Sequence, residues 1–240
     1  MFFTNHCSGL KKNQLQCYTF RMNTLSRNEI ISRVTNMVCN RTVAALEAHD
    51  FKAIYCPTAA DATAHILRTT EGAKTIGLGA SMSVSALSIE ATLIAQGAEI
   101  LNHLTPGITF EEQNRILRAQ QTCDVFISSV NAVTTSGEIV NIDGVGNRVS
   151  ASIYGPGKII LVVGRNKIVD GDIADAIRRV KNFAASANSV RLNKDTPCAT
   201  NGYCTDCDSS DRICRVTMIM ERKPTRSDII VLVVNEDLGY

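Results

Sequence analysis

Four cysteines crowd into one short segment near the end of the sequence, CATNGYCTDCDSSDRIC: Cys198, Cys204, Cys207 and Cys214. Cys204 and Cys207 have the two-residue separation at which two thiolates bind one metal ion, and two further thiolates complete a four-sulfur shell. The spacing differs from the common ferredoxin run, so Zn²⁺ and a 4Fe-4S cluster are both open as the metal group. The alternatives are reduced structural thiols and disulfides across a loop.

A second segment, GLGASMSVS at 77–85, lies between an expected strand and an expected helix. Its candidate binding residues are Gly79, Ser81 and Ser83. Glycine lets the backbone approach a ligand, and serine hydroxyls with free amides at the start of a helix bind anions. The segment lacks the third glycine of the dinucleotide fingerprint and the Gly-Lys-Ser/Thr of the P-loop. Ordinary capping and turn formation are the alternative.

A third segment, TTSGEIVNIDGVGNRVSASIYGPGK at 134–158, surrounds a short expected strand with glycines and polar side chains. Its polar candidates are Glu138, Asn141, Asp143, Asn147 and Arg148. They would converge at the carboxyl edge of a sheet, where open α/β folds bind ligands. Arg148 would bind a carboxylate or phosphate through its bidentate guanidinium. A tight hairpin at 136–138, in which the turn requires glycine, is the alternative.

Histidine contributes one candidate, His103, which follows the strand AEIL at the sheet edge expected to carry the second and third segments. His49 and His65 are expected to be surface or capping residues. Glu236 and Asp237, in the final NEDLGY segment, would either close the sheet or approach the site.

The elements that would position these segments alternate between helix and strand. Helices are predicted at 26–49, from Thr58 through Leu67, through Leu87 to Gly97, at 111–121, from about Asn147, and at 172–187. Strands are predicted at 51–56, 74–79, 98–101, 124–130, 138–142, 158–164, 216–220 and 228–234. Short apolar strands separated by helices indicate a mostly parallel sheet covered on both faces. We therefore expect an α/β fold, in one domain covering 22–240.

The chain has 240 residues, a net charge of +2 and 45% hydrophobic residues, which suffices for a domain with a sizeable core. No cluster of Lys and Arg indicates a nucleic-acid interface, and no apolar run is long enough to cross a bilayer. Residues 1–21 have the features of neither a secretory signal nor a periodic helix, so we expect an extension outside the fold. Without an export signal we expect the reducing cytoplasm, where cysteines are thiols or metal ligands.

Several of these segments together resemble the lactate-utilisation (LUD) domain family, whose members include LutC-type proteins. The resemblance rests on GLGASMSVS, the stretch 134–169, the cysteine segment and the terminal NEDLGY, and it covers about Ser26 to Tyr240. It implies a three-layer α/β sandwich like that of the sugar-phosphate isomerase and CoA-transferase group.

The resemblance also assigns residues to two family loops. Gly79, Ser81 and Ser83 occupy the first, and Gly137, Asn141, Asp143, Gly144, Asn147 and Arg148 occupy the second. This sequence has Glu138 where many relatives have threonine, so this loop either binds a different group or adds a carboxylate. The four-cysteine segment occurs in only part of the family.

The resemblance implies a subunit or accessory factor of the oxidation of L-lactate or a related 2-hydroxyacid. Such a protein would bind a small anionic ligand between the two loops and work with iron–sulfur partner subunits, and it is compatible with a homo-oligomer. One alternative is a non-catalytic ligand-sensing or assembly module for an iron–sulfur partner. The other is an acyl or CoA transferase, with Glu138 as the covalent nucleophile.

Overall fold

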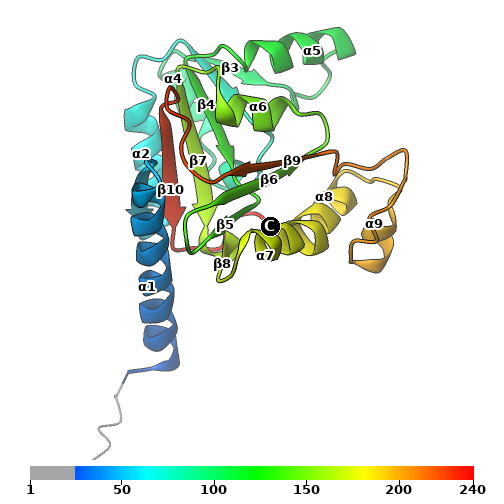
Figure 1. Cartoon of the computed structure of the whole chain (residues 1–240). Coiled ribbons are helices and arrows are strands. Elements are labelled where there is room, and N and C mark those ends of the chain that lie inside the picture. Colours follow the sequence, from blue (N-terminus) through cyan, green and yellow to red (C-terminus); the bar gives the residue numbers. More distant parts are fainter. Residues whose placement is uncertain (1–24) are drawn as a thin grey trace, which may run out of the picture.

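The computed structural model describes residues 25–240, so the extension expected at 1–21 lies outside the described residues. The centre of the fold is a six-stranded sheet in the order β1-β10-β7-β4-β2-β3, and every neighbouring pair is parallel. Its strands are β1 (Lys52–Cys56), β2 (Thr75–Leu78), β3 (Glu99–Asn102), β4 (Val125–Ser129), β7 (Lys158–Gly164) and β10 (Ile229–Val234). The expected α/β fold with a mostly parallel sheet is confirmed (Figure 1).

A second, smaller sheet is not predicted by the sequence. It contains β8 (Ile168–Val169), β5 (Ala132–Thr134), β6 (Ile139–Asp143) and β9 (Val216–Met220), in that order. β6 pairs antiparallel with β5 and with β9, whereas β5 and β8 are parallel. β5 and β6 form a hairpin whose turn holds Gly137 at a φ of 104°, so a hairpin does occur at 136–138. The segment 216–220 is a strand as expected, but it belongs to this second sheet.

Helices and the small sheet cover the two faces of the main sheet. The helices are α1 (Arg27–Ala48), α2 (Ala59–Thr69), α3 (Met82–Ser85), α4 (Glu90–Ala95), α5 (Phe110–Ala119), α6 (Asn147–Ile153), α7 (Ile173–Arg179), α8 (Ala185–Arg191) and α9 (Pro197–Asn201). One face packs against α2 and the α3–α4 region. The other packs against α1, α5, α6 and the small sheet. α7 and the helical turn that follows it, Val180–Ala184, cover the outer side of the small sheet.

Local sequence explains most of these boundaries. Capping boxes begin α1 at Ser26, α2 at Thr58 and α7 at Asp172, because in each the side chain three residues later bonds back to the cap. Every residue of β10 is buried, which accounts for its uninterrupted apolar run. Ser88, at a φ of 50°, separates α3 from α4, so the single helix predicted through Leu87 was wrong.

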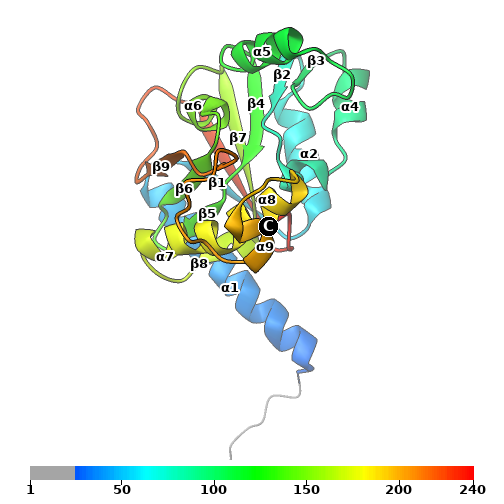
Figure 2. The ribbon, with the colours of Figure 1, turned by 90° about the vertical axis from the view of Figure 1, so that its right-hand side faces the viewer.

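The helix predicted at 172–187 is longer and less regular than expected. It continues from α7 through a π-helical turn at Val180–Ala184 into α8, which ends at Arg191. Figure 2 shows α8 and α9 beside the C-terminal end of the chain, and Tyr240 Oη lies 3.1 Å from Asn188 Oδ1 of α8. The last residue is thereby anchored to this helix.

The parallel sheet brings segments distant in sequence to one edge. Gly79 follows β2, His103 follows β3, Asn131 follows β4 and Lys167 follows β7, all at the carboxyl ends of their strands. This is the edge at which open parallel sheets place their ligands.

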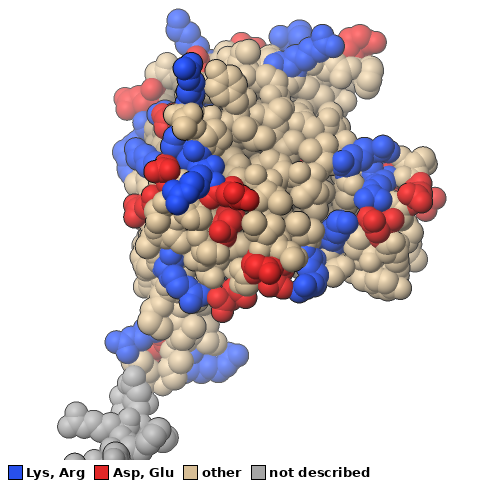
Figure 3. Space-filling model, in the orientation of Figure 1, with Lys and Arg blue, Asp and Glu red and all other residues tan. Residues whose placement is uncertain are grey.

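The described surface has mixed charge on one face, and the described helices are not of the membrane-spanning type. On the face shown in Figure 3, Lys and Arg side chains are interspersed with Asp and Glu instead of forming one basic patch. Across residues 25–240, no helix combines the length and apolar character needed to span a membrane.

Candidate functional site

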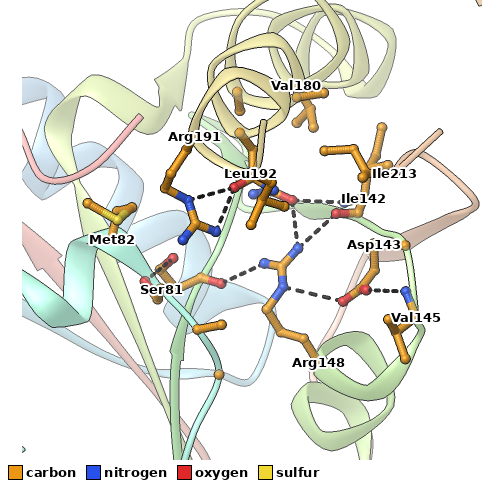
Figure 4. A pocket seen from close by; sticks show the side chains of 18 of the residues that line it. Ser81, Met82, Ile142, Asp143, Val145, Arg148, Val180, Arg191, Leu192 and Ile213 are labelled. Carbon is orange, nitrogen blue, oxygen red and sulfur yellow. Dashed lines mark hydrogen bonds and ion pairs between the residues drawn. The ribbon is translucent and has the colours of Figure 1, made fainter. Parts of the chain in front are cut away.

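A cavity of about 310 Å³ opens at the carboxyl edge of the main sheet, between the loops that follow its strands, the β6–α6 loop and α8 (Figure 4). Six of the predicted site residues line it: Gly79, Ser81, Asp143, Gly144, Asn147 and Arg148. His103 also lines it, as expected for the histidine at this edge. The two predicted loops therefore meet at one cavity.

Arg148 is the centre of a hydrogen-bond network beneath this cavity. Nη1 donates to Ser129 O (3.4 Å) and Asn141 Oδ1 (3.2 Å). Nη2 donates to Asn131 Oδ1 (3.1 Å) and Ile142 O (2.8 Å), so all four terminal N–H groups are used within the protein. The guanidinium therefore supplies positive charge to the cavity, but it offers no free fork for bidentate binding of a ligand.

Asp143 is the acidic partner of Arg148. Asp143 Oδ1 accepts the backbone N–H groups of Val145 (3.0 Å) and Gly146 (3.1 Å) and so shapes the β6–α6 loop. Asp143 Oδ2 lies 3.3 Å from Arg148 Nε, an ion contact without the alignment of a hydrogen bond. Burial lowers the pKa of Arg148, and the neighbouring Asp143 carboxylate opposes that shift. The pair is buried together, so each charge depends on the other.

Lys167 lies in the 3₁₀ turn Arg165–Lys167 directly after β7, and its side chain reaches the cavity. Its ammonium donates to Ser83 Oγ (2.7 Å) and Val130 O (3.1 Å) and contacts Ser129 Oγ (3.4 Å). Burial, followed by the charges of Arg179 and Arg148, lowers its pKa to about 7. Lys167 thus changes charge near neutral pH, and a nearby anion would favour the charged form.

The cavity carries an excess of positive charge. Its lining contains four basic side chains, Arg148, Lys167, Arg191 and Lys194, against one acidic side chain, Asp143. Arg191 is exposed at the rim and bonds Asn188 Oδ1 through Nε (3.0 Å) and Nη2 (2.8 Å). Among residues 25–240 its Nη1 has no hydrogen-bond partner, so it can reach a bound molecule. Burial lowers the pKa of His103, which favours its neutral form.

The glycine–serine loop after β2 is mainly a framework for the cavity. A Cβ on Gly79 would lie 2.5 Å from Ser128 Oγ, so only glycine allows this loop to pass so close to β4. Ser81 Oγ donates to Ser129 Oγ (2.7 Å) and accepts Val84 N–H, which caps α3. Ser83 does not line the cavity; it is buried behind it and accepts the Lys167 hydrogen bond.

Three further predicted residues also lie outside the cavity lining. Gly137 and Glu138 are in the β5–β6 turn, at the end of β6 opposite Asp143, roughly 16 Å away along the strand. Glu138 accepts hydrogen bonds from Thr134 and Ser136. Asn141 lies behind the cavity, where its Oδ1 accepts Asn131 N–H (2.7 Å) and the Arg148 bond.

The four cysteines of the predicted metal site line one small pocket beside the main cavity. Across the described part of the chain, no three or more His, Cys, Asp or Glu side chains are already arranged to hold a metal ion, so the expected coordination shell is not formed. Cys39, Cys56 and Cys123 are buried elsewhere, and burial raises the pKa of each thiol to about 11. These three behave as small apolar core residues.

Several residues of the cavity lining are not predicted from the sequence. They are Ser129, Asn131, Lys167, Arg191 and Lys194. A signal existed for two of them, because Asn131 directly follows the predicted strand 124–130 and Lys167 is the third residue after the predicted strand 158–164, both at the ligand-binding edge. Arg191 and Lys194 lie beyond the predicted end of their helix, and only the tertiary fold brings them to the rim.

Fold and site together define an α/β protein with a cationic cavity at the carboxyl edge of a parallel sheet. The sequence model of the LUD domain family matches residues 39–234, and the chain belongs to this family.

Comparison with solved structures gives distant matches. A crystal structure of a DUF162 family protein from Deinococcus radiodurans is similar at 16% identity and a TM-score of 0.46, covering 88% of this chain and 99% of that chain. A crystal structure of eIF2B beta from Chaetomium thermophilum is similar at 16% identity and a TM-score of 0.32, covering 62% of this chain and 48% of that chain. None of the curated proteins matches the sequence.

Proposed function

We infer that the protein binds a small organic anion in the cationic cavity, as a subunit or accessory factor in the oxidation of L-lactate or a related 2-hydroxyacid. The observation that carries this inference is the lining, with four basic side chains against one acidic side chain. Asp143 already neutralises Arg148, but Lys167 is buried with no carboxylate partner among the described residues, and a bound anion would supply that partner. Membership of the LUD domain family supports a 2-hydroxyacid as the ligand class.

The size and shape of the cavity support a small ligand. Its volume of about 310 Å³ is at the lower end of the range for small-molecule sites. Ile142, Val145 and Ile213 provide apolar wall next to the charged groups. A carboxylate with a short carbon chain matches this combination of a charged end and an apolar wall.

The basic residues would divide the work of binding. Arg191, exposed at the rim, would contact the carboxylate directly, and Lys194, which pairs with Asp211 at 3.6 Å, would add positive charge beside it. Arg148 and Lys167, whose hydrogen bonds are made within the protein, would act through their positive potential. Fixed internal bonds keep these two charges in place before the ligand arrives, so little reorganisation is needed.

Oxidation of a 2-hydroxyacid to a 2-oxoacid releases two electrons and two protons, so an electron acceptor is required. In this proposal an iron–sulfur partner subunit accepts the electrons, and the LUD domain positions the substrate anion. The position of Glu138 does not support the acyl-transferase alternative, because its carboxylate is bonded to Thr134 and Ser136 in the hairpin turn and does not line the cavity.

Titration calorimetry of the full chain with L-lactate, pyruvate, inorganic phosphate and coenzyme A tests the proposal. We expect a short 2-hydroxy or 2-oxo carboxylate to bind most tightly, and Arg191→Gln to weaken its binding about tenfold, ~1.4 kcal/mol. Arg68→Gln, an exposed change on α2 away from the cavity, is the matched control and should leave affinity unchanged. Failure of every anion to bind would refute the proposal. Binding without turnover in the presence of the partner would favour the sensing alternative.

A further inference from the structure

The pocket beside the anion cavity is formed by the four-cysteine segment, residues 198–214, folded against α8. Its lining includes the side chains of all four cysteines, although the first and last are sixteen positions apart. Ala185 and Ser189 of α8 form the floor. All four sulfurs are free thiols, so the segment is closed without a disulfide.

The segment is braced from within. Asp206 N–H points to Cys204 Sγ at 3.4 Å, a backbone hydrogen bond of the kind that stabilises a ligating thiolate. Arg212 donates to Cys207 O (2.6 Å), Cys214 O (2.8 Å) and the Asp206 carboxylate (2.8 Å). One guanidinium thus ties together three parts of the segment and places a positive charge where several thiolates would gather.

The size of the pocket distinguishes a single ion from a cluster. Its volume of about 20 Å³ is close to the space that one water molecule needs. A single ion fits this space, whereas a cube of four irons and four sulfides does not. Four thiolates with no open position are the ligand set of a structural zinc site.

We propose that Cys198, Cys204, Cys207 and Cys214 bind one Zn²⁺ as a tetrahedral thiolate site, and that the ion fixes the wall of the anion cavity. The four cysteines already border one pocket, and the proposal requires their side chains to turn toward one another when the ion binds. The ion replaces the missing apolar core of a segment in which no residue is fully buried.

The second half of the proposal rests on the proposed anion site. Ile213 and Cys214 line both the thiol pocket and the anion cavity. The next residue, Arg215, donates its backbone N–H to Asp143 O at 2.9 Å. Zinc at Cys214 therefore holds the wall next to the Arg148–Asp143 pair, and its loss loosens that wall.

Elemental analysis and cobalt substitution of the full chain test the zinc site. We expect one zinc per chain, no acid-labile sulfide, and thiolate-to-cobalt charge-transfer bands after exchange with Co²⁺. Cys204→Ser should lose most of the metal, whereas Cys56→Ala, a cysteine buried in the core, should keep it. Iron with sulfide, or a chain that takes up no zinc when it is supplied, would overturn the proposal.

Native alkylation keeps the test decisive where Cys204→Ser fails to fold. With zinc present, mass spectrometry should find the four cysteines of the segment protected, and a chelator should expose all four together. Equal labelling with and without zinc would overturn the site.

Anion affinity measured with and without zinc tests the coupling separately. We expect removal of zinc to weaken anion binding about tenfold. Unchanged affinity would overturn the coupling while the zinc count stands. If no anion binds to the zinc-loaded chain, the proposed function fails instead, and the metal analysis still decides the zinc site.

Discussion

Arg148 Nε lies 3.3 Å from Asp143 Oδ2, and the two side chains are the buried ion pair on which the β6–α6 loop is built. Arg148→Met would leave Asp143 without its ion-pair partner and would remove the donor from four part-buried hydrogen bonds. We expect this change to lower the free energy of unfolding by about 3–5 kcal/mol, as for other broken buried pairs. Urea denaturation followed by circular dichroism measures it.

The matched control is Arg41→Met, which breaks the exposed Arg41–Asp170 pair. Its effect on stability should stay within about 0.5 kcal/mol. A fully stable Arg148→Met protein that has lost only anion binding would contradict the structural role and would return Arg148 to direct ligand contact.

Lys167 should make stability and ligand binding depend on pH. Its pKa is about 7 in the folded protein against 10.5 ordinarily, so the unfolded chain binds more protons between these values. The free energy of unfolding should therefore rise with pH from about 7 upward, and Lys167→Met should lose this rise. Denaturant titrations at several pH values measure the slope.

The same lysine predicts proton uptake on anion binding. An anion favours the charged form, so binding above pH 7 should draw in a proton, and affinity should fall as pH rises. Calorimetry in two buffers of different ionisation enthalpy reports the uptake. Identical heats in both buffers would show that Lys167 does not sense the ligand.

Gly79→Ala should disturb the cavity through a clash between the new Cβ and side chains of β4. The new Cβ would lie 2.5 Å from Ser128 Oγ and 2.9 Å from the Phe126 ring, so β2 and β4 must separate. We expect a loss of about 1–3 kcal/mol, measured by thermal and urea unfolding. Ala80→Gly is the informative comparison, since Ala80 has a φ of 51° and glycine relieves that strain. Equal destabilisation by both changes would contradict this account.

Glu138→Gln should leave anion affinity unchanged, because Glu138 is in the hairpin turn. Burial raises the pKa of Glu138, but hydrogen bonds from Thr134 and Ser136 outweigh this and lower it. We expect a stability loss of about 1 kcal/mol and no covalent adduct with acyl-CoA in the unaltered protein. A glutamyl thioester trapped at Glu138 and seen by mass spectrometry would revive the transferase alternative.

Much of the main sheet could be predicted because its signals are local. Strands such as β7 and β10 are short apolar runs, and capping boxes mark the starts of α1, α2 and α7. The small sheet escapes prediction because β5 and β8 have three and two residues, too few for a periodic pattern. Which sheet β9 joins depends on pairing with β6, more than seventy residues earlier, and a local pattern does not contain that information.

The candidate site, like the fold, could be predicted from the sequence only in part. Asp143 and Arg148 are close in sequence, so their shared loop could be predicted. Their engagement with each other and with Asn131 could not, because side-chain hydrogen bonds depend on the tertiary fold. The sequence pattern also predicts one sheet edge for Glu138 and Asp143, but the five residues of β6 separate them along the length of the strand.

The place of β10 between β1 and β7 has a consequence for how the molecule assembles. Residues 229–234 fill the gap between the strand that starts the sheet and a strand formed about seventy residues earlier. Until they are synthesised, β1 has no partner in the main sheet, and both β1 and β7 expose open edges. The contacts of β10 with β1 and β7 therefore form late and close long loops of the chain, which lowers the folding rate. Until then the unpaired apolar strands can aggregate. Truncation before Ile229 should yield an insoluble fragment, not a smaller working domain.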